Sequence, residues 1–333
     1  MAHKAILALT LALAAVSLCA AFDEPFEYVE ATDGAKLALY RETGGELGPV
    51  VLVHGLGSNR YNFLVGPGGG LANYLVARGF DVFIFEERGM GRSGLGKDNG
   101  FEQTALSDFP LILARVRKLT GRTPQAIGHS LGGMIIGAYL ANAASPDLRA
   151  AVIVSSPYEF RPNNTIYRFA KGHPKTAYIF TRFPFEFFLR ALAPLEGERV
   201  PYSGIGYAHG TVDGKVIREF ARRGIEKPPA DLQRDFSRFI LEGCICSSDG
   251  KSYVAGFKRA RVPILVLAGF GDEIAPPELV RPWFDVSASE DKSFVLVSRA
   301  NGFSADAGHG DILVGRYAAR EIYPLICRWL KER

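Results

Sequence analysis

The sequence predicts an α/β protein in which a mostly parallel sheet is covered by helices on both faces. Short apolar runs alternate along the chain with segments of helical spacing, an order typical of parallel strands joined by helices. The runs are continuous rather than alternating, which indicates strands buried on both faces. They are the segments 50–53, 82–85, 126–127, 151–154, 264–267 and 294–297.

The segments between these runs carry turn signals and helical spacing of their own. Glycines stand where helices are expected to stop or strands to turn. The predicted elements are a β-hairpin over 26–40 around Asp33-Gly34, helices over 71–78 and 106–119 that stop at Gly79 and Gly121, and a helix from the turn at 128–133 to about Ala144.

The alternation breaks after Pro157 and resumes beyond Val262. We therefore expect a core formed by residues 22–157 and 258–333, with 158–257 inserted as a helical cap. A second independent domain is the alternative, but the strand–helix order continues beyond the insertion as if uninterrupted. Phenylalanines gather in the insertion, at Phe180, Phe183, Phe185, Phe187 and Phe188.

The first 21 residues have the pattern of a secretory signal peptide. Lys4 precedes a continuous apolar stretch over 5–16, and small residues follow before Asp23. A stretch of about a dozen apolar residues fits a cleavable signal better than a membrane span. We expect export to the periplasm or the medium. An uncleaved anchor, an N-terminal core helix and a lipoprotein site at Cys19 are the alternatives.

The overall composition is that of an ordinary globular protein, with 47% hydrophobic and 22% charged residues. A net charge of +4 is too small and too dispersed to favour nucleic acid or an anionic membrane surface. The expected partner is a small, uncharged molecule, and no membrane insertion is needed after signal cleavage. The sequence does not indicate an oligomeric state.

Three cysteines remain beyond the signal: Cys244, Cys246 and Cys327. An odd number leaves at least one unpaired within the chain. Cysteines two apart on an extended strand are too distant for a disulfide, so Cys244 and Cys246 are not expected to pair with each other. A bridge from either of them to Cys327 stays open. No spacing resembles a metal site, and we expect neither metal nor cofactor.

The pentapeptide Gly128-His129-Ser130-Leu131-Gly132 is the strongest chemical signal. A serine hydroxyl is a poor nucleophile and must be held exposed beside a base. A tight turn between a strand and a helix does this, and the glycines at 128 and 132 let the backbone and the helix approach closely. A predicted strand and a predicted helix flank this turn, so Ser130 is the candidate nucleophile rather than an inert turn serine.

The candidate base is His309, which lies after the last predicted strand and before the final helix. Serine hydrolases built on such a sheet carry the serine, the acid and the histidine in that chain order. His309 fits this order, whereas a solvated loop histidine is the alternative reading. The other five histidines lie in the signal (His3), the first strand's loop (His54), the serine turn (His129) and the cap (His173 and His209).

The candidate acid is Asp272, directly after the predicted strand 264–267. There it would accept the imidazole N–H and fix the tautomer of His309. The position after a strand end favours Asp272 over its neighbour Glu273. Two more distant rivals are Asp306 and Asp311.

The loop His54-Gly55-Leu56-Gly57 follows the first buried strand. A tetrahedral intermediate needs two backbone N–H donors aimed at its oxyanion. The expected donors are the N–H groups of Leu131, after the nucleophile, and of Leu56 in this loop. His54 is expected to hold the loop by hydrogen bonds rather than to transfer protons, with Gly55 as a supporting residue.

These motifs together resemble the α/β-hydrolase superfamily: His54-Gly55, the segment 88–93 (RGMGRS), the serine turn, Gly271-Asp272 and Gly308-His309. The resemblance covers nearly all of 50–156 and 262–325 but not the cap. It implies an eight-stranded, mostly parallel sheet with the three catalytic side chains on loops at the strands' C-terminal ends. Segments 71–82 and 272–277 are similar to acid lipases and polyhydroxyalkanoate synthases. Serine at position 130 argues against the synthases, which use cysteine, and against relatives that use an aspartate nucleophile.

The function expected from these residues is hydrolysis of a carboxylic ester through an acyl-enzyme, by an esterase or a lipase. The phenylalanine-rich segment 180–188 suits a hydrophobic ester, although these rings would equally pack the cap onto the core. An amidase, peptidase or acyltransferase with the same side chains is one alternative. A non-catalytic binding protein of the same fold is another.

Overall fold

The computed structural model describes residues 22–160, 206–208 and 210–333. The predicted signal peptide and the phenylalanine-rich segment 180–188 lie outside the described residues. The described residues form one eight-stranded sheet, in the order β1-β2-β4-β3-β5-β6-β7-β8. The strands are β1 (Glu27–Glu30), β2 (Lys36–Thr43), β3 (Pro49–Val53), β4 (Asp81–Phe85), β5 (Gln125–His129), β6 (Ala151–Val154), β7 (Ile264–Gly269) and β8 (Lys292–Val297).

The sheet is mostly parallel, as predicted. β1 and β2 form the predicted antiparallel hairpin, and β2 also runs antiparallel to β4. The remaining neighbours, from β4 to β8, pair in parallel. Every residue of β3 to β7 is buried, which explains the continuous apolar runs in β3, β4, β6 and β7 and the short Ala126-Ile127 run in β5.

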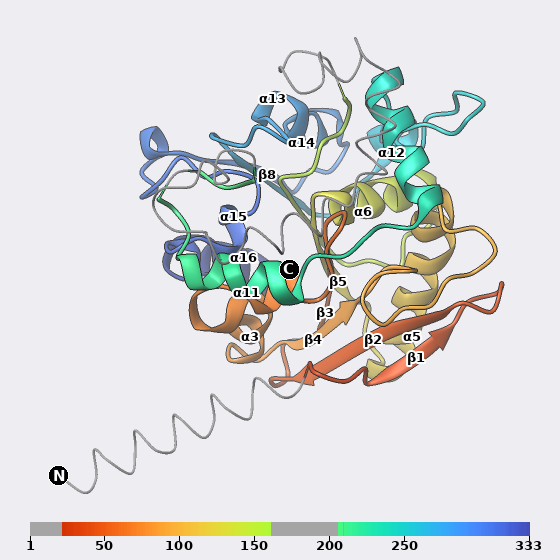
Figure 1. Ribbon diagram of the computed structural model, residues 1–333, viewed down its shortest axis with the longest axis horizontal. Helices are drawn as coiled ribbons and strands as arrows, with labels where there is room; N and C mark the ends of the chain where they lie inside the picture. Colours follow the sequence, from red (N-terminus) through yellow and green to blue (C-terminus); the bar gives the residue numbers. More distant parts are fainter. Residues whose placement is uncertain (1–21, 161–205, 209) are drawn as a thin grey trace, which may run out of the picture.

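Helices cover both faces of the sheet (Figure 1). One apolar core lies between the sheet and α5 and α6, and the other lies between the sheet and α3 and α16. The helices are α2 (Tyr61–Leu64), α3 (Gly70–Val76), α4 (Phe101–Gln103), α5 (Phe109–Thr120), α6 (Leu131–Asn142), α11 (Gly214–Arg223), α12 (Ala230–Glu242), α13 (Pro277–Val280), α14 (Pro282–Val286), α15 (Asp311–Val314) and α16 (Ala318–Lys331), with 3-10 turns η1 (Pro67–Gly69), η4 (Ala255–Arg259) and η5 (Arg299–Asn301) and a π-turn η2 (Thr104–Asp108).

The helix predicted over 106–119 begins earlier than expected. α4 starts at Phe101 and continues through the π-turn η2 into α5. The missed turns carry three successive polar residues, Glu102, Gln103 and Thr104, which hide the helical spacing before Leu106. The predicted part of the helix already included Asp108, in the middle of this stretch. The structure shows why a carboxylate is tolerated there: Asp108 is buried and accepts two hydrogen bonds of 2.6 Å from the guanidinium of Arg88.

The structure describes part of the segment 158–257 that is predicted to form a cap. β6 pairs directly with β7, so the chain between them leaves the sheet and returns to it. α11, which contacts α2, and α12, which contacts α4, belong to this excursion. Residues 161–205 and 209 lie outside the described part, so the full extent of the cap stays a prediction. Within the described part, no helix combines the length and apolarity needed to span a membrane.

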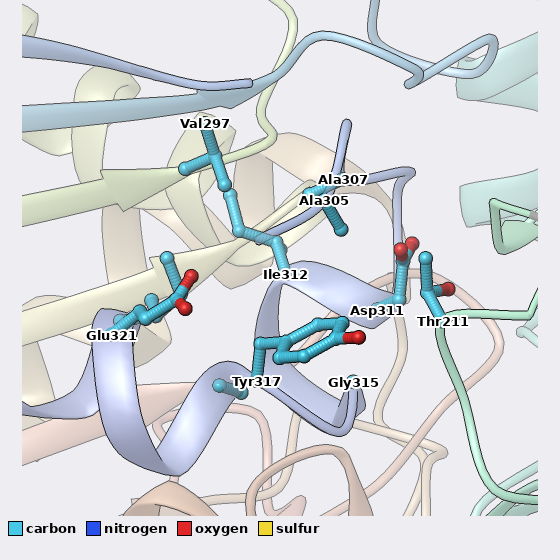
Figure 2. A pocket seen from close by; sticks show the side chains of 11 residues that line it. Thr211, Val297, Ala305, Ala307, Asp311, Ile312, Gly315, Tyr317 and Glu321 are labelled. Carbon is cyan, nitrogen blue, oxygen red and sulfur yellow. The ribbon is translucent and has the colours of Figure 1, made fainter. Parts of the chain in front are cut away.

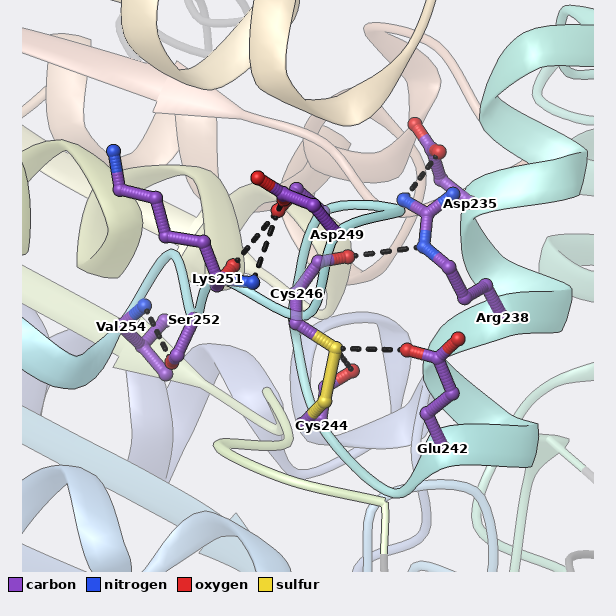
Figure 3. Close-up of a disulfide and its surroundings, with 10 residues drawn as sticks. Asp235, Arg238, Glu242, Cys244, Cys246, Asp249, Lys251, Ser252 and Val254 are labelled. Atoms are coloured by element: carbon purple, nitrogen blue, oxygen red, sulfur yellow. Dashed lines mark hydrogen bonds and ion pairs between the residues drawn. A yellow bond between two sulfur atoms is a disulfide. The ribbon is translucent and has the colours of Figure 1, made fainter.

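The expectation that Cys244 and Cys246 do not pair is wrong. The two cysteines form a disulfide, with Cα atoms 5.5 Å apart (Figure 3). The prediction assumed extended backbone, but the chain bends over 243–245 after the left-handed Gly243 that ends α12. The bend brings the Cα atoms within disulfide range. Cys327 is a free, buried cysteine of α16, so it does not bridge to either.

Candidate active site

Ser130 stands at a sharp turn between β5 and α6. It has a φ of +54°, a backbone conformation that a non-glycine residue rarely adopts. Its neighbours on either side belong to the strand and to the helix, so the turn consists of this single residue. The serine side chain is thereby held out of both elements, at the C-terminal end of the sheet's central strands.

Two glycines make this turn sterically accessible. A Cβ atom on Gly132 would lie 2.1 Å from the carbonyl oxygen of Val53 at the end of β3. A Cβ atom on Gly128 would lie 2.4 Å from the backbone of Gly132. No side chain fits at either position without moving α6 away from the sheet, which is the reason the motif needs glycine there.

The structure brings Ser130, His309 and Asp272 together. His309 Nε2 lies 2.9 Å from Ser130 Oγ, and His309 Nδ1 lies 2.9 Å from Asp272 Oδ2. The other carboxylate oxygen, Oδ1, accepts the N–H groups of Ile274 (2.9 Å) and Ala275 (2.7 Å). Since Asp272 offers only acceptors, His309 carries its proton on Nδ1 and turns the Nε2 lone pair toward the serine hydroxyl.

The burial of these side chains differs in a way that suits proton transfer. The Asp272 side chain is fully buried, while 11% of the His309 side chain is exposed. Two backbone N–H groups hold the buried carboxylate and so partly compensate its negative charge. The imidazole lies between this fixed charge and the more accessible serine.

The rival acids lie elsewhere. Glu273 is exposed, and Asp306 accepts the backbone N–H of Arg299 at 2.9 Å. Asp311 lines a cavity of about 20 Å³, beside Thr211 (Figure 2). It faces the N–H of Ala208 at 3.4 Å, and burial raises the pKa of its carboxyl. Asp272 is thus the carboxylate that meets the imidazole.

The loop after β3 lies directly against the serine turn. A Cβ atom on Gly55 would lie 3.2 Å from both Ser130 Cβ and His129 Nδ1, so glycine allows this close approach. Leu131 is the first residue of α6, and its N–H has no intrahelical acceptor. Within the described chain, no backbone or side-chain acceptor is bonded to the N–H of Leu56 or Leu131.

The orientation of the Leu56 N–H follows from its own peptide group. The Gly55 carbonyl accepts hydrogen bonds from the Ser58 N–H (3.2 Å) and from His54 Nδ1 (3.0 Å). All described peptide bonds are trans, and in a trans peptide the C=O and the next N–H point in opposite directions. Fixing the Gly55 carbonyl therefore fixes the Leu56 N–H on the opposite side.

His54 acts on this loop as a neutral ring. Its Nε2 accepts the N–H of Glu87 at 3.2 Å, so the ring proton is on Nδ1 and is donated to Gly55. Burial lowers the pKa of His54. Glu87, whose Oε1 lies 3.6 Å from Nδ1, is fully buried without a hydrogen bond to either carboxyl oxygen in the described chain. Burial raises the pKa of the Glu87 carboxyl well above its usual range.

Replacing His54 by alanine is expected to lower kcat roughly 10- to 100-fold while the protein stays folded. The Gly55–Leu56 peptide loses one of its two anchors, and losing a whole oxyanion donor costs roughly 10²- to 10³-fold. The measurement is steady-state ester hydrolysis beside thermal unfolding. Full kcat in a folded His54→Ala variant would show that the loop keeps its orientation without the imidazole.

Sequence reasoning missed Asn62, on α2. Its Oδ1 accepts the Gly55 N–H at 2.9 Å and lies 3.0 Å from His129 Nδ1. His129 Nε2 in turn lies 3.0 Å from the carbonyl oxygen of His309. Asn62 and His129 thus connect three segments: the loop 54–57 with the predicted Leu56 donor (the oxyanion loop), the serine turn 128–132, and the loop that carries His309 (the base loop). No local pattern marks Asn62, because its partner His129 is 67 residues away in the chain.

The ring of His129 faces an oxygen acceptor at each nitrogen but is neutral. Burial, together with the nearby His309, lowers the pKa of His129 to about 3. A neutral imidazole has one N–H, so only one of its two contacts is a hydrogen bond at a time. The ring therefore donates a hydrogen bond either to Asn62 Oδ1 or to the carbonyl oxygen of His309. Burying a positive charge is costly, so the ring does not take up a second proton to donate to both.

This burial has a measurable consequence for stability. Between pH 6.5 and about 3 the unfolded chain binds a proton at His129 that the folded chain does not, so the free energy of unfolding falls as the pH is lowered. The contribution of His129 is about 1.4 kcal/mol per pH unit in that window. Denaturant unfolding of wild type and His129→Gln at several pH values isolates it, because other groups cancel in the difference. A difference that does not change with pH would contradict a neutral buried ring.

The excursion between β6 and β7 also contacts the oxyanion loop. Asn59 Nδ2 donates to the carbonyl of Arg223 (2.8 Å) and to Glu226 Oε1 (2.7 Å). The Glu226 N–H donates to the Gly57 carbonyl at 2.8 Å, beside an antiparallel bridge between Ser58 and Ile225. The segment after α11 is therefore hydrogen-bonded to the loop that carries the Leu56 N–H.

Metal-ligating side chains gather at one place in the described chain, away from these loops in sequence. They are Glu242, Cys244 and Cys246. The two sulfurs are joined in the disulfide and are therefore not thiolates, the form in which cysteine binds metals. We assign no metal to this group.

The fold and the site together define a class: an α/β protein with a mostly parallel sheet and a serine, a histidine and an aspartate meeting at the sheet's C-terminal edge. The family described as alpha/beta hydrolase fold matches residues 48–285, more than half of the chain. The protein belongs to the α/β-hydrolase fold family, and the resemblance inferred from its motifs is confirmed.

Individual relatives are more distant. A non-heme chloroperoxidase from Burkholderia pyrrocinia is 29% identical over 214 residues, which are 61% of this chain and 68% of that protein. An esterase from Exiguobacterium antarcticum has a TM-score of 0.64 at 16% identity, covering 92% of this chain and 99% of its own. An enol-lactonase from Burkholderia xenovorans LB400 has a TM-score of 0.63 at 17% identity, covering 91% and 99%. At these identities the two solved structures establish a shared fold.

Proposed function

We propose that the protein is a serine hydrolase that cleaves carboxylic esters through an acyl-enzyme. The observation that carries this proposal is the pair of 2.9 Å contacts from His309, one to Ser130 Oγ and one to Asp272 Oδ2. A nucleophile, a base and an orienting acid in hydrogen-bond reach of one another are what acyl transfer at serine needs.

In the first half-reaction, Ser130 Oγ attacks the ester carbonyl while His309 Nε2 takes the hydroxyl proton. Asp272 stabilises the imidazolium that forms, without itself becoming protonated. The N–H groups of Leu56 and Leu131 donate to the oxyanion of the tetrahedral intermediate. The C–O bond to the alcohol then breaks, and His309 returns the proton to the leaving oxygen. The products of this step are the free alcohol and the Ser130 ester.

In the second half-reaction, a water molecule takes the place of the alcohol. His309 removes a proton from the water as it attacks the acyl carbonyl, and the same N–H groups hold the second oxyanion. The intermediate collapses with proton return to Ser130 Oγ, which releases the carboxylic acid. Apart from the ester and this water molecule, the steps use only the chain's own residues.

An ester is favoured over an amide by the demands on the leaving group. An alkoxide is a better leaving group than an amide anion, so amide cleavage depends more strongly on how well His309 protonates the leaving nitrogen. Amidase, peptidase and acyltransferase activities are the second candidates because they use the same three side chains.

Two further parts of the proposal rest on the sequence alone. A hydrophobic acyl group is proposed as the part of the substrate that the aromatic insertion accommodates. Export through the N-terminal signal is proposed for the compartment in which the enzyme acts. Both concern residues outside the described part of the chain.

A chain-length series of p-nitrophenyl esters, assayed beside p-nitroanilides of the same acyl groups, tests the substrate class. The expected result is release of p-nitrophenol with a preferred acyl length, and much slower release of p-nitroaniline. Comparable rates for the anilides would favour an amidase. No turnover of any ester by a folded protein would contradict the proposal.

A further inference from the structure

The Cys244–Cys246 disulfide lies directly after α12, outside the hydrolase site described above (Figure 3). One residue separates the two cysteines. A disulfide stabilises a fold mainly by restricting the unfolded chain, and a link across a single residue restricts it little. Support of the fold is therefore a weak explanation for this bond.

The loop that holds the disulfide is anchored by other bonds. Arg238 Nε donates to the Cys246 carbonyl at 3.1 Å, and the same guanidinium is bound by Asp235 at 2.7 Å. The Tyr253 N–H donates to the Ile245 carbonyl at 2.9 Å. None of these bonds involves a sulfur atom, so the loop can keep its shape when the S–S bond opens.

The two sulfurs are not equivalent. Cys244 is partly exposed, whereas Cys246 is fully buried. Thiol–disulfide exchange begins by attack on the accessible sulfur and expels the other as the leaving group. In this pair the attack falls on Cys244, and Cys246 is the sulfur that is released.

A carboxylate is placed at the released sulfur. Glu242 Oε2 lies 3.1 Å from Cys246 Sγ. In the disulfide this sulfur has no hydrogen, so the oxygen faces a sulfur that cannot donate to it. In the dithiol the Cys246 S–H would donate to the carboxylate, a charge-assisted hydrogen bond that only the reduced form makes. The contact therefore stabilises the dithiol relative to the disulfide at equilibrium.

We propose that Cys244 and Cys246 form a redox-active pair that exchanges with small-molecule thiols, a property separate from ester hydrolysis. A thiolate RS⁻ attacks Cys244 Sγ, the S–S bond breaks, and its electron pair goes to Cys246 Sγ. The Cys246 thiolate then takes a proton from water. The resulting S–H donates a hydrogen bond to Glu242. A second RS⁻ attacks the R-bearing sulfur and releases RSSR and the Cys244 thiolate, which is then protonated. Two RSH are oxidised and the disulfide is reduced to two thiols.

Glutathione redox buffers test the pair on the full chain. After equilibration, free thiols are trapped by alkylation and located by peptide mass spectrometry, with the buried Cys327 as the internal reference. The expected result is reversible reduction of the pair while ester hydrolysis or, if there is none, the folded state is retained. Glu242→Ala is expected to shift the equilibrium constant against the dithiol by roughly 3- to 10-fold. Arg234→Ala, on the exposed side of the same helix, is the matched control.

Single-cysteine variants test the order of attack. Cys246→Ser is expected to form a stable glutathione adduct at Cys244, and Cys244→Ser is expected to resist modification at Cys246. If either variant fails to fold, the same order is read in wild type by mapping the mixed disulfide in partly reduced samples. A pair that stays oxidised until the protein unfolds, or adducts spread equally over both cysteines, would overturn the proposal. Because the readout is thiol content, neither result depends on the hydrolase function.

Discussion

Ser130→Ala is expected to lower kcat for ester hydrolysis roughly 10⁴- to 10⁶-fold. The variant keeps the base, the acid and the N–H groups but has no atom that can attack the carbonyl. Alanine also accepts the turn conformation about as well as serine does, since both carry a Cβ at the φ of +54°. Stability should therefore change little, and the loss should appear in kcat rather than in KM.

Steady-state kinetics with the preferred p-nitrophenyl ester measure this loss, and thermal unfolding verifies the fold. Ser248→Ala, at an exposed serine, is the matched control and should keep wild-type kcat. Wild-type rates in Ser130→Ala would mean that another group attacks the ester, and the role given to the serine turn would be wrong.

Asp272→Asn is expected to lower kcat by about 10⁴-fold, with the side chain in place. Oδ1 of Asp272 accepts two backbone N–H groups, from Ile274 and Ala275. In the variant the amide oxygen occupies that position, and the NH₂ group faces His309 Nδ1. The imidazole must then accept at Nδ1 and carry its proton on Nε2, where it cannot take the proton of Ser130.

The control for this variant is Glu273→Gln, which makes the same chemical change at the exposed neighbour and should leave kcat near wild type. Proton NMR of the imidazole distinguishes the tautomers directly. If Asp272→Asn keeps most of its activity, a different carboxylate orients His309, and Asp311 is the first to test.

Most of the sheet was predictable because strands that are buried on both faces have runs of consecutive apolar residues. β3, β4, β6 and β7 are covered on both faces, so they carry uninterrupted apolar runs, whereas β5 shows only Ala126-Ile127 between polar residues and glycine. The order of Ser130, Asp272 and His309 was equally readable, since each follows a strand and the C-terminal ends of parallel strands meet at one edge. The structure then brought the three side chains to hydrogen-bond distance.

The residues that hold the site in position could not be predicted from local patterns. Asn62 is recognised only by its distance to Gly55 and His129, which depends on how β3 and β5 pair. The start of α4 was hidden by three successive polar residues, Glu102, Gln103 and Thr104, which interrupt the apolar spacing. Cys244 and Cys246 pair because the backbone bends, and spacing alone does not report a bend.

The most direct test of Ser130 as an activated nucleophile is covalent labelling with a fluorophosphonate, followed by peptide mapping. Only a serine whose proton is removed by a neighbouring base reacts rapidly with such a probe. The predicted result is stoichiometric labelling at Ser130 in wild type, its loss in Ser130→Ala, and much slower labelling in Asp272→Asn. A folded wild-type protein that takes no label, or takes it at another serine, would contradict the assignment of Ser130, His309 and Asp272 as the reacting group.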